Sequence, residues 1–142
     1  MKTDSGQSMF EVLLALFIIT LIVVAVVILS TISISNSLFS KNKTLSSKYT
    51  QEAVEWLRSQ KESDINLFLT NSTDTYCLDQ LNFTNQGLCA ELEIIPNSIF
   101  TRQMVFTNSG NIVSVVVTTS WTDSKGIHQV STSTDFTDRR EQ

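Results

Sequence analysis

The side chains that could support catalysis are few and scattered along this sequence. The single histidine, His128, stands alone in a polar stretch after a turn, so we expect an exposed imidazole. Neither Cys77 nor Cys89 has a basic neighbour in sequence that would favour a thiolate. Glu91 and Glu93 share one face of a predicted strand, but no partner acid or base accompanies them. The sequence therefore predicts a protein that is not an enzyme.

Sites for a cofactor, a metal or a nucleic acid are not indicated either. The sequence contains no glycine-rich phosphate loop and no serine nucleophile motif. Two cysteines and one histidine do not make the four-ligand set of a structural zinc site, so we predict no metal and no cofactor. The net charge is −4, whereas a protein that binds the phosphate backbone needs clustered lysine and arginine. No nucleic-acid partner is predicted.

Apolar residues gather at the N-terminal end, where 24 of the first 40 positions are apolar. Val12 to Leu29 is a run of 18 residues with no charge and one hydroxyl, that of Thr20. A helix of this length extends about 27 Å, close to the hydrocarbon thickness of a bilayer. Many of these residues are β-branched and would favour a buried strand in a soluble protein, but within lipid only a helix satisfies its own backbone. The sequence therefore predicts a transmembrane helix, followed by one small domain of about 100 residues.

A short motif precedes this helix. The polar leader MKTDSG ends at Gly6, the segment QSMFE begins at Gln7, and the carboxylate of Glu11 directly precedes the 18 apolar residues. Without a side chain, Gly6 allows an extended, open peptide in a protease cleft. A carboxylate at the edge of lipid requires a cationic partner or a proton. This pattern resembles the N-terminus of type IV prepilins, in which a leader ends in glycine, cleavage follows that glycine, and glutamate is the fifth residue after the cut.

The resemblance implies a structural subunit that forms filaments. A prepilin peptidase would cut between Gly6 and Gln7, and Glu11 would then guide assembly by meeting the N-terminal amine of a neighbouring subunit. The partners would be other pilin subunits, bound through the N-terminal helix, and the inner-membrane assembly machinery. Ile28 stands where major pilins commonly carry proline, which favours a minor pilin.

The same resemblance implies a location and an orientation. The precursor would cross the inner membrane once, with its N-terminus in the cytoplasm and its C-terminal domain outside, and the mature protein would join a cell-surface or periplasmic filament. The lysines favour the reverse orientation by the positive-inside rule, because Lys41, Lys43 and Lys48 follow the helix while Asp4 offsets Lys2 in the leader. We follow the prepilin pattern.

Two other functions fit the same residues. One is a minor pseudopilin of a type II secretion or DNA-uptake machine, which the sequence does not separate from a pilus subunit. The other is a membrane-anchored binding module with a single span, in which the bond between Gly6 and Gln7 is never cut. An intact Met1 in the mature protein would favour the anchored module, and a new terminus at Gln7 would favour the pilin family.

Beyond the membrane the helix is expected to continue with one apolar face. Apolar residues recur at spacings of 7, 4, 4 and 3, at Leu38, Leu45, Tyr49, Ala53 and Trp56. This spacing is typical of an amphipathic helix. Lys48 and Glu52 are four residues apart and are predicted to pair on its surface.

The C-terminal part predicts an antiparallel sheet. Alternating patterns indicate strands from Ile99 to Thr107, from Asn111 to Trp121 and from Ile127 to Phe136. Short connections that contain glycine join them as hairpins, and Arg102 interrupts the apolar row of the first strand. A meander packed on the second half of a long N-terminal helix is an α+β architecture, and it is similar to the pilin fold.

These elements divide the chain into four segments. They are a leader over 1–6, the transmembrane and assembly half of the helix over 7–35, its amphipathic half over 36–61, and a globular β domain over 62–142. The topology of the pilin family places that domain outside the cytoplasm, where Cys77 and Cys89 would form a disulfide and close the loop 77–89. Two buried free thiols are the alternative.

Overall fold

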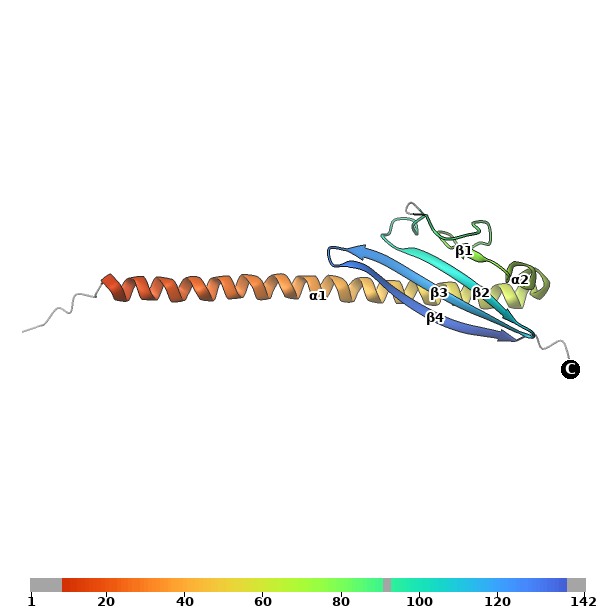
Figure 1. Cartoon of the computed structure of the whole chain (residues 1–142), viewed down its shortest axis with the longest axis horizontal. Helices are drawn as coiled ribbons and strands as arrows, with labels where there is room; N and C mark the ends of the chain where they lie inside the picture. Colours follow the sequence, from red (N-terminus) through yellow and green to blue (C-terminus); the bar gives the residue numbers. More distant parts are fainter. Residues whose placement is uncertain (1–8, 91–92, 138–142) are drawn as a thin grey trace, which may run out of the picture. The chain divides into compact units, whose positions relative to one another are not determined.

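The computed structural model describes residues 9–90 and 93–137, and the chain divides into two compact units, 1–40 and 41–142. Figure 1 shows one long helix and an antiparallel sheet of four strands, which is the α+β architecture that the sequence predicts. In chain order the elements are α1 (Met9–Ser63), α2 (Ile65–Asn71), β1 (Thr75–Cys77), β2 (Thr101–Ser109), β3 (Ile112–Asp123) and β4 (Gly126–Thr137).

The first unit contains the apolar part of α1. Its side chains are exposed on every side of the helix, as the values of 56% for Leu16 and 55% for Val23 illustrate. The hydroxyl of Thr20 donates to the carbonyl oxygen of Leu16 at 2.7 Å, so the one polar group of the run is satisfied within the helix. This part of α1 is long and apolar enough to span a membrane.

The second unit contains the sheet, whose strand order is β1-β2-β3-β4 with every neighbouring pair antiparallel. The β2–β3 hairpin closes at the pair Ser109↔Ile112, and Gly110 in its turn has a φ of 62°, a conformation that glycine adopts without steric cost. The β3–β4 hairpin closes at Asp123↔Gly126. The three predicted strands are confirmed, and their ends lie within two residues of the predicted ones.

The core lies between the sheet and the part of α1 that belongs to the second unit. Burial alternates along β3 because every second side chain points at the helix. The rings of Phe68 in α2 and Phe136 in β4 meet edge to face, with their centroids 5.2 Å apart. The cluster of buried residues is Ala53, Val54, Leu57, Phe68, Tyr76, Leu78, Met104, Phe106, Val113, Val115, Val117 and Phe136.

A short row of hydroxyl groups continues the buried face of α1 toward its N-terminal end. Ser46, Thr50 and Thr119 are completely buried. Ser46 Oγ donates to the carbonyl oxygen of Thr119 at 3.1 Å, and Thr50 Oγ1 lies 2.9 Å from Thr119 Oγ1. Small side chains at these positions let the helix and the strand approach closely while each buried polar group keeps a partner.

Several details of the sequence prediction need correction. Leu38 is 56% exposed and belongs to the first unit, so the buried stripe of α1 starts later than predicted. The elements α2 and β1 were not predicted, because 7 and 3 residues are too few to show a hydrophobic period. Glu93 lies in no strand, and Glu91 lies outside the described residues.

Candidate functional site

Of the N-terminal motif, the structure places Glu11, while Gly6 and Gln7 lie outside the described residues. Glu11 is in the first turn of α1, where the partial positive charge of a helix N-terminus favours a carboxylate. Its apolar neighbours Met9 and Phe10 are 81% and 73% exposed. Within the described part of the first unit, Glu11 is the single charged residue.

The apolar surface that follows Glu11 covers the whole circumference of the helix. From Val12 to Leu29 the large apolar side chains are between 47% and 66% exposed, with no buried face. A helix that is apolar all round needs apolar surroundings on all sides, either lipid or other helices. Glu11 therefore places one carboxylate near the N-terminal end of this apolar surface, between Phe10 and Val12.

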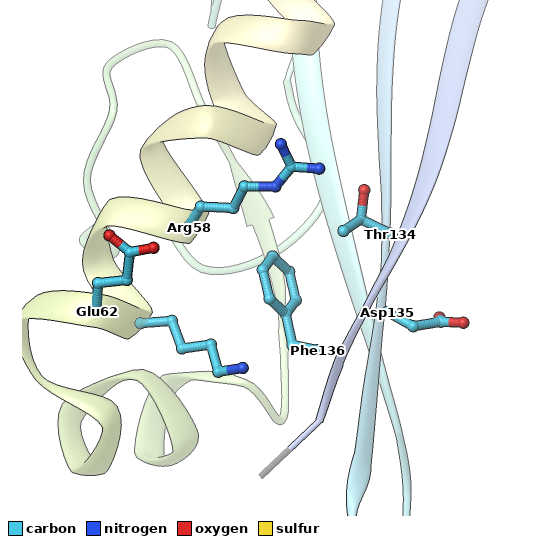
Figure 2. Close-up of a pocket in the computed structure, with 6 residues that line it drawn as sticks. Arg58, Glu62, Thr134, Asp135 and Phe136 are labelled. Atoms are coloured by element: carbon cyan, nitrogen blue, oxygen red, sulfur yellow. The ribbon is translucent and has the colours of Figure 1, made fainter. Parts of the chain in front are cut away.

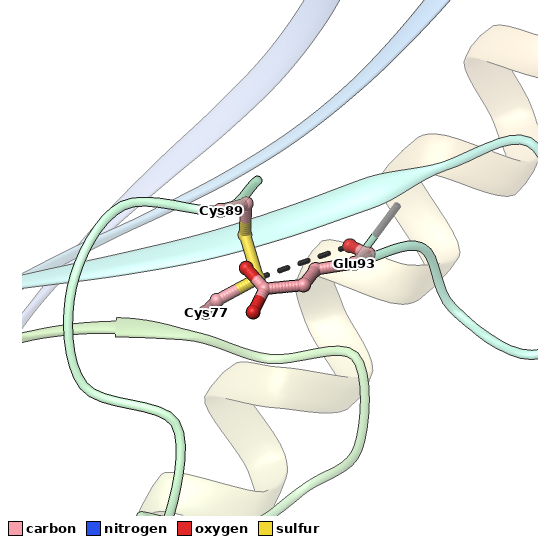
Figure 3. A group of neighbouring side chains, drawn as sticks. All are labelled: Cys77, Cys89 and Glu93. Carbon is pink, nitrogen blue, oxygen red and sulfur yellow. Dashed lines mark hydrogen bonds between the residues drawn. A yellow bond between two sulfur atoms is a disulfide. The ribbon is translucent and has the colours of Figure 1, made fainter. Parts of the chain in front are cut away.

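The predicted disulfide is present in the second unit. Cys77, at the end of β1, is bonded to Cys89. Figure 3 shows Glu93 passing beside this bond, with its carbonyl oxygen 3.8 Å from Cys77 Sγ. The side chain of Glu93 accepts hydrogen bonds from Asn85 Nδ2 at 2.9 Å and from the N–H of Ala90 at 2.6 Å. These two bonds lower the pKa of Glu93, with Asn85 the larger cause.

The same three side chains form the one group in residues 9–90 and 93–137 whose atoms could together face a metal ion. One possible ligand atom from each of Cys77, Cys89 and Glu93 lies within 4.8 Å of the others. Both sulfurs are consumed in the disulfide, and a metal would need them as thiolates. The Glu93 carboxylate is also engaged by two donors. The group therefore closes the loop 77–89 and does not present thiolate ligands.

Arg102 is the most deeply buried charged residue that the structure describes, at 2% exposure. Its Nε donates to the carbonyl oxygen of Leu78 at 3.1 Å, and its Nη1 donates to that of Tyr49 at 3.0 Å and to Glu52 Oε2 at 3.1 Å. Glu52 therefore pairs with Arg102, whereas the sequence spacing predicted a pair with Lys48. Arg102 therefore joins three parts of the chain in one network: strand β2, helix α1, and Leu78, which follows β1.

The electrostatics of Arg102 fit a structural role. Burial lowers the pKa of the guanidinium, while the hydrogen bond and the charge of Glu52 oppose that shift. An arginine stays protonated at physiological pH even when it is buried. The cation is therefore permanent, and the two carbonyl groups and the carboxylate replace the water that it loses on folding.

The prediction of an exposed histidine is wrong. The side chain of His128 is 24% exposed, its Nε2 lies 3.0 Å from Asp123 Oδ1, and its ring lies 5.2 Å from that of Trp121. Asp123 Oδ1 also accepts the N–H of Lys125 at 2.7 Å, and this bond is the main cause of its lowered pKa, followed by the bond to His128. These contacts fix the hairpin between β3 and β4.

Sequence reasoning missed the network of Arg102, although one signal was present. Arg102 lies between Phe100 and Met104 on the inward face of its strand, where an unpaired charge would be very costly. That position implies a buried partner. A comparison of the chain with protein-family models, with curated proteins and with solved structures found no match.

Proposed function

We propose that this protein is a minor pilin, a structural subunit of a type IV pilus-like filament that is stored in the membrane through α1 and cut by a prepilin peptidase after Gly6. One observation carries the proposal. The first unit is a helix with an apolar surface on every side, and Glu11 is the single charge in its described part, at its first turn.

The energetics of assembly support this reading. Transfer of the helix from Val12 to Leu29 into water would expose its entire apolar surface, which is unfavourable at about 25 cal/mol per Å². A bundle of neighbouring helices is about as apolar as lipid, so passage from the membrane into a filament core avoids that cost. Glu11 is the group whose loss of hydration costs most free energy in either setting, unless a cation pairs with its carboxylate. The free amine that cleavage creates on a neighbouring subunit is such a cation.

The domain fits an extracytoplasmic location. The disulfide between Cys77 and Cys89 is of a kind that persists in oxidising compartments. The domain and the leader would then lie on opposite sides of the membrane. The peptidase would cut the leader on the cytoplasmic side. This agrees with the prepilin orientation, and the lysines that follow the helix are the feature that opposes it.

The decisive experiment is mass spectrometry of the N-terminal peptide of the protein purified from its native membrane or filaments. We expect the chain to begin at Gln7, with or without a methyl group on its amine. The variant Gly6→Val should keep Met1, because a β-branched side chain does not fit where the peptidase requires glycine. The matched variant Ser5→Ala changes the adjacent leader residue and should still be cut. An intact Met1 in the unaltered protein would overturn the proposal and leave the anchored binding module.

A second measurement separates a subunit from a cleaved but solitary protein. Shearing and sedimentation of surface filaments should recover the chain together with other subunits that share the same kind of N-terminal helix. A secretion or DNA-uptake pseudopilin would be found instead in short assemblies that remain with the membrane fraction. Recovery of the chain only as a monomer in both fractions contradicts a filament subunit.

A further inference from the structure

The strand β4 forms one edge of the sheet, and alternate residues along it direct their backbone groups outward. The β3–β4 hairpin closes at the pair Asp123↔Gly126 with two residues between them. In a hairpin of this kind the closing pair is hydrogen-bonded, and every second pair after it is hydrogen-bonded as well. The residues between those pairs therefore point their N–H and C=O groups away from β3. These residues are Gln129, Ser131, Ser133 and Asp135.

One contact agrees with this alternation. Thr137 is the next residue in the outward series, and its carbonyl oxygen accepts a hydrogen bond from Lys61 Nζ at 2.8 Å rather than from β3. Among the residues that the structure describes, β4 has β3 as its one neighbouring strand. No further backbone bond outside the ladder involves the stretch from Gln129 to Asp135 in those residues.

This edge lacks the features with which proteins usually block strand addition. β4 is 12 residues long and contains no proline, no lysine and no arginine. The residues with outward-facing backbone groups all have exposed side chains. The residues that alternate with them along the strand are half-buried, and they are Val130, Thr132 and Thr134. A strand with these properties is a template for pairing with another extended chain.

A pocket of 310 Å³ lies at the C-terminal end of the same edge, next to the last turns of α1. It is lined by Arg58, Lys61, Glu62, Thr134, Asp135 and Phe136. Figure 2 shows the guanidinium of Arg58 reaching toward Thr134 and the ring of Phe136 standing between the helix and β4. Asp135 points away from the helix, where its Oδ1 accepts the hydroxyl of Ser114 at 2.7 Å.

Arg58 and Lys61 bring two cations to the lining of this pocket and Glu62 brings one carboxylate, while the carboxylate of Asp135 points away from the helix. Lys61 Nζ lies 5.6 Å from the centroid of the Phe136 ring, in cation–π geometry. Arg58 is half exposed, and among residues 9–90 and 93–137 its ion pair is with Glu55 on the same helix, at 2.8 Å. Five donors on a guanidinium leave Arg58 capacity for a second carboxylate. The donors of Arg58 and Lys61 at this pocket therefore fit an acidic side chain.

A second copy of β4 does not match this edge and its pocket together. Within the second unit β4 runs in the same direction as α1, because Thr119, the partner of Val130, contacts Ser46, while Thr137 contacts Lys61. Two identical edges can pair only antiparallel, about a twofold axis. That pairing would place the beginning of the second β4 at the pocket, and β4 has no acidic residue before Asp135, so a second copy does not supply an acidic side chain there.

We propose that the β4 edge binds an extended, acidic segment of a partner protein by strand addition. The segment pairs antiparallel with the backbone of Gln129 to Asp135, and an acidic side chain near its N-terminal end reaches Arg58 and Lys61. Antiparallel pairing is the more stable arrangement and places that end of the segment at the pocket. The inference uses only the second unit and holds whether or not the chain is cut after Gly6.

The test uses the full-length protein in lipid nanodiscs and the peptide acetyl-Glu-Val-Thr-Val-Thr-Val-Thr-amide. Amide hydrogen exchange, followed residue by residue by NMR, should slow on binding at Gln129, Ser131 and Ser133. Val130 and Thr132 already donate to β3, so their exchange should not change. Protection that does not alternate, or no protection at saturating peptide, overturns strand addition.

Three variants and a second peptide test the two parts of the proposal separately. Ser131→Pro removes an outward N–H and no bond to β3, so it should abolish binding while the domain stays folded. Combined Arg58→Gln and Lys61→Gln should weaken binding about tenfold, and replacement of the peptide's Glu by Gln should cause the same loss. Lys43→Gln, a lysine of α1 outside the pocket, should change nothing. Unaltered binding by Ser131→Pro, or equal affinity for the two peptides, contradicts the proposal.

Discussion

Arg102 Nη1 lies 3.1 Å from Glu52 Oε2, and this contact connects β2 to α1 across 50 residues of sequence. The two partners are unequal, because the side chain of Arg102 is 3% exposed and that of Glu52 is 53% exposed. The carboxylate keeps much of its water, whereas the guanidinium depends on protein groups alone. The stability of this network is therefore decided by Arg102.

We predict that Arg102→Met destabilises the domain by about 3 kcal/mol. The substitution leaves the carbonyl oxygens of Leu78 and Tyr49 buried without a donor, and each such loss costs about 1–3 kcal/mol. Glu52→Gln should cost only about 1 kcal/mol, since its partner keeps both carbonyl acceptors and water screens the exposed side. Denaturant unfolding of the full-length protein in detergent micelles, followed by tryptophan fluorescence, measures both.

The control for this pair is Arg58→Met, which removes an ion pair that is largely exposed at both ends. Its effect on the free energy of unfolding should be near zero, within about 0.5 kcal/mol. Equal costs for Arg58→Met and Arg102→Met would show that the buried network adds nothing beyond surface charge.

The disulfide should make a second, independent contribution to the free energy of unfolding. Replacement of both Cys77 and Cys89 by serine should lower the free energy of unfolding by about 3 kcal/mol, the loop entropy expected for a closure of this length. The sequence separation between the two residues is 12. Reduction of the unaltered protein should cause a similar loss, while the double variant should be insensitive to reductant. A double variant as stable as the parent rules out this contribution.

The buried hydroxyl groups of Thr50 in α1 and Thr119 in β3 should be coupled in their contributions to the free energy of unfolding. Thr50→Val keeps the volume of the side chain but removes the oxygen that lies 2.9 Å from Thr119 Oγ1, so it should cost about 1–2 kcal/mol. In the double variant Thr50→Val with Thr119→Val, no hydroxyl is left without its partner at this contact. We expect that double variant to cost less than the sum of the single ones, by about 0.5–1 kcal/mol. Strict additivity in the same unfolding assay would show that the two hydroxyls do not interact.

Acid should destabilise the domain through two carboxylates. The pKa values of Glu93 and Asp123 are lower in the folded protein than their ordinary values of 4.5 and 3.8. Such a group contributes stability that is fully present above its unfolded pKa and is lost as the pH falls through its folded pKa. The free energy of unfolding should therefore be constant near neutral pH and fall below about pH 4.5.

The variant Glu93→Gln isolates one of these groups. It should reduce the slope of the free energy of unfolding against pH in the acid range, because an amide does not titrate. The amide oxygen can still accept the hydrogen bond from Asn85, but more weakly than the carboxylate does. Asp74→Asn is a suitable control, since this carboxylate lies outside both groups of contacts. An acid limb with the same slope in Glu93→Gln as in the parent protein would locate the titration elsewhere.

The parts of the fold that sequence analysis predicted are those with long periodic patterns. The strands β2, β3 and β4 and the amphipathic half of α1 repeat their hydrophobic spacing often enough to be recognised, whereas the first half of α1 is recognised as an unbroken apolar run. The contacts that define the interior are different. The pairing of Arg102 with Glu52 and of Thr50 with Thr119 joins residues 50 and 69 positions apart, and no local pattern records such a distance.

The edge of the sheet was also invisible in the sequence. Its strand was predicted, but which strand ends the sheet follows from the order β1-β2-β3-β4, and β1 is only 3 residues long. The N-terminal motif is the opposite case. Its meaning comes from the order of Gly6, Gln7 and Glu11 along the chain, which the sequence gives directly and no tertiary contact is needed to define.

The last prediction concerns Glu11 and follows from the proposed assembly function. Glu11→Gln removes the charge but keeps the size and the apolar helix that follows, so membrane insertion and cleavage after Gly6 should be unaffected. Incorporation into filaments should fall by at least about tenfold, because the new amine of a neighbouring subunit loses its anionic partner in an apolar setting. The measurement compares the amount of the chain in sheared filaments with that in the membrane, and Thr20→Ala serves as a control within the same helix. If Glu11→Gln enters filaments as well as the control does, the carboxylate does not guide docking, even where the cleavage itself is confirmed.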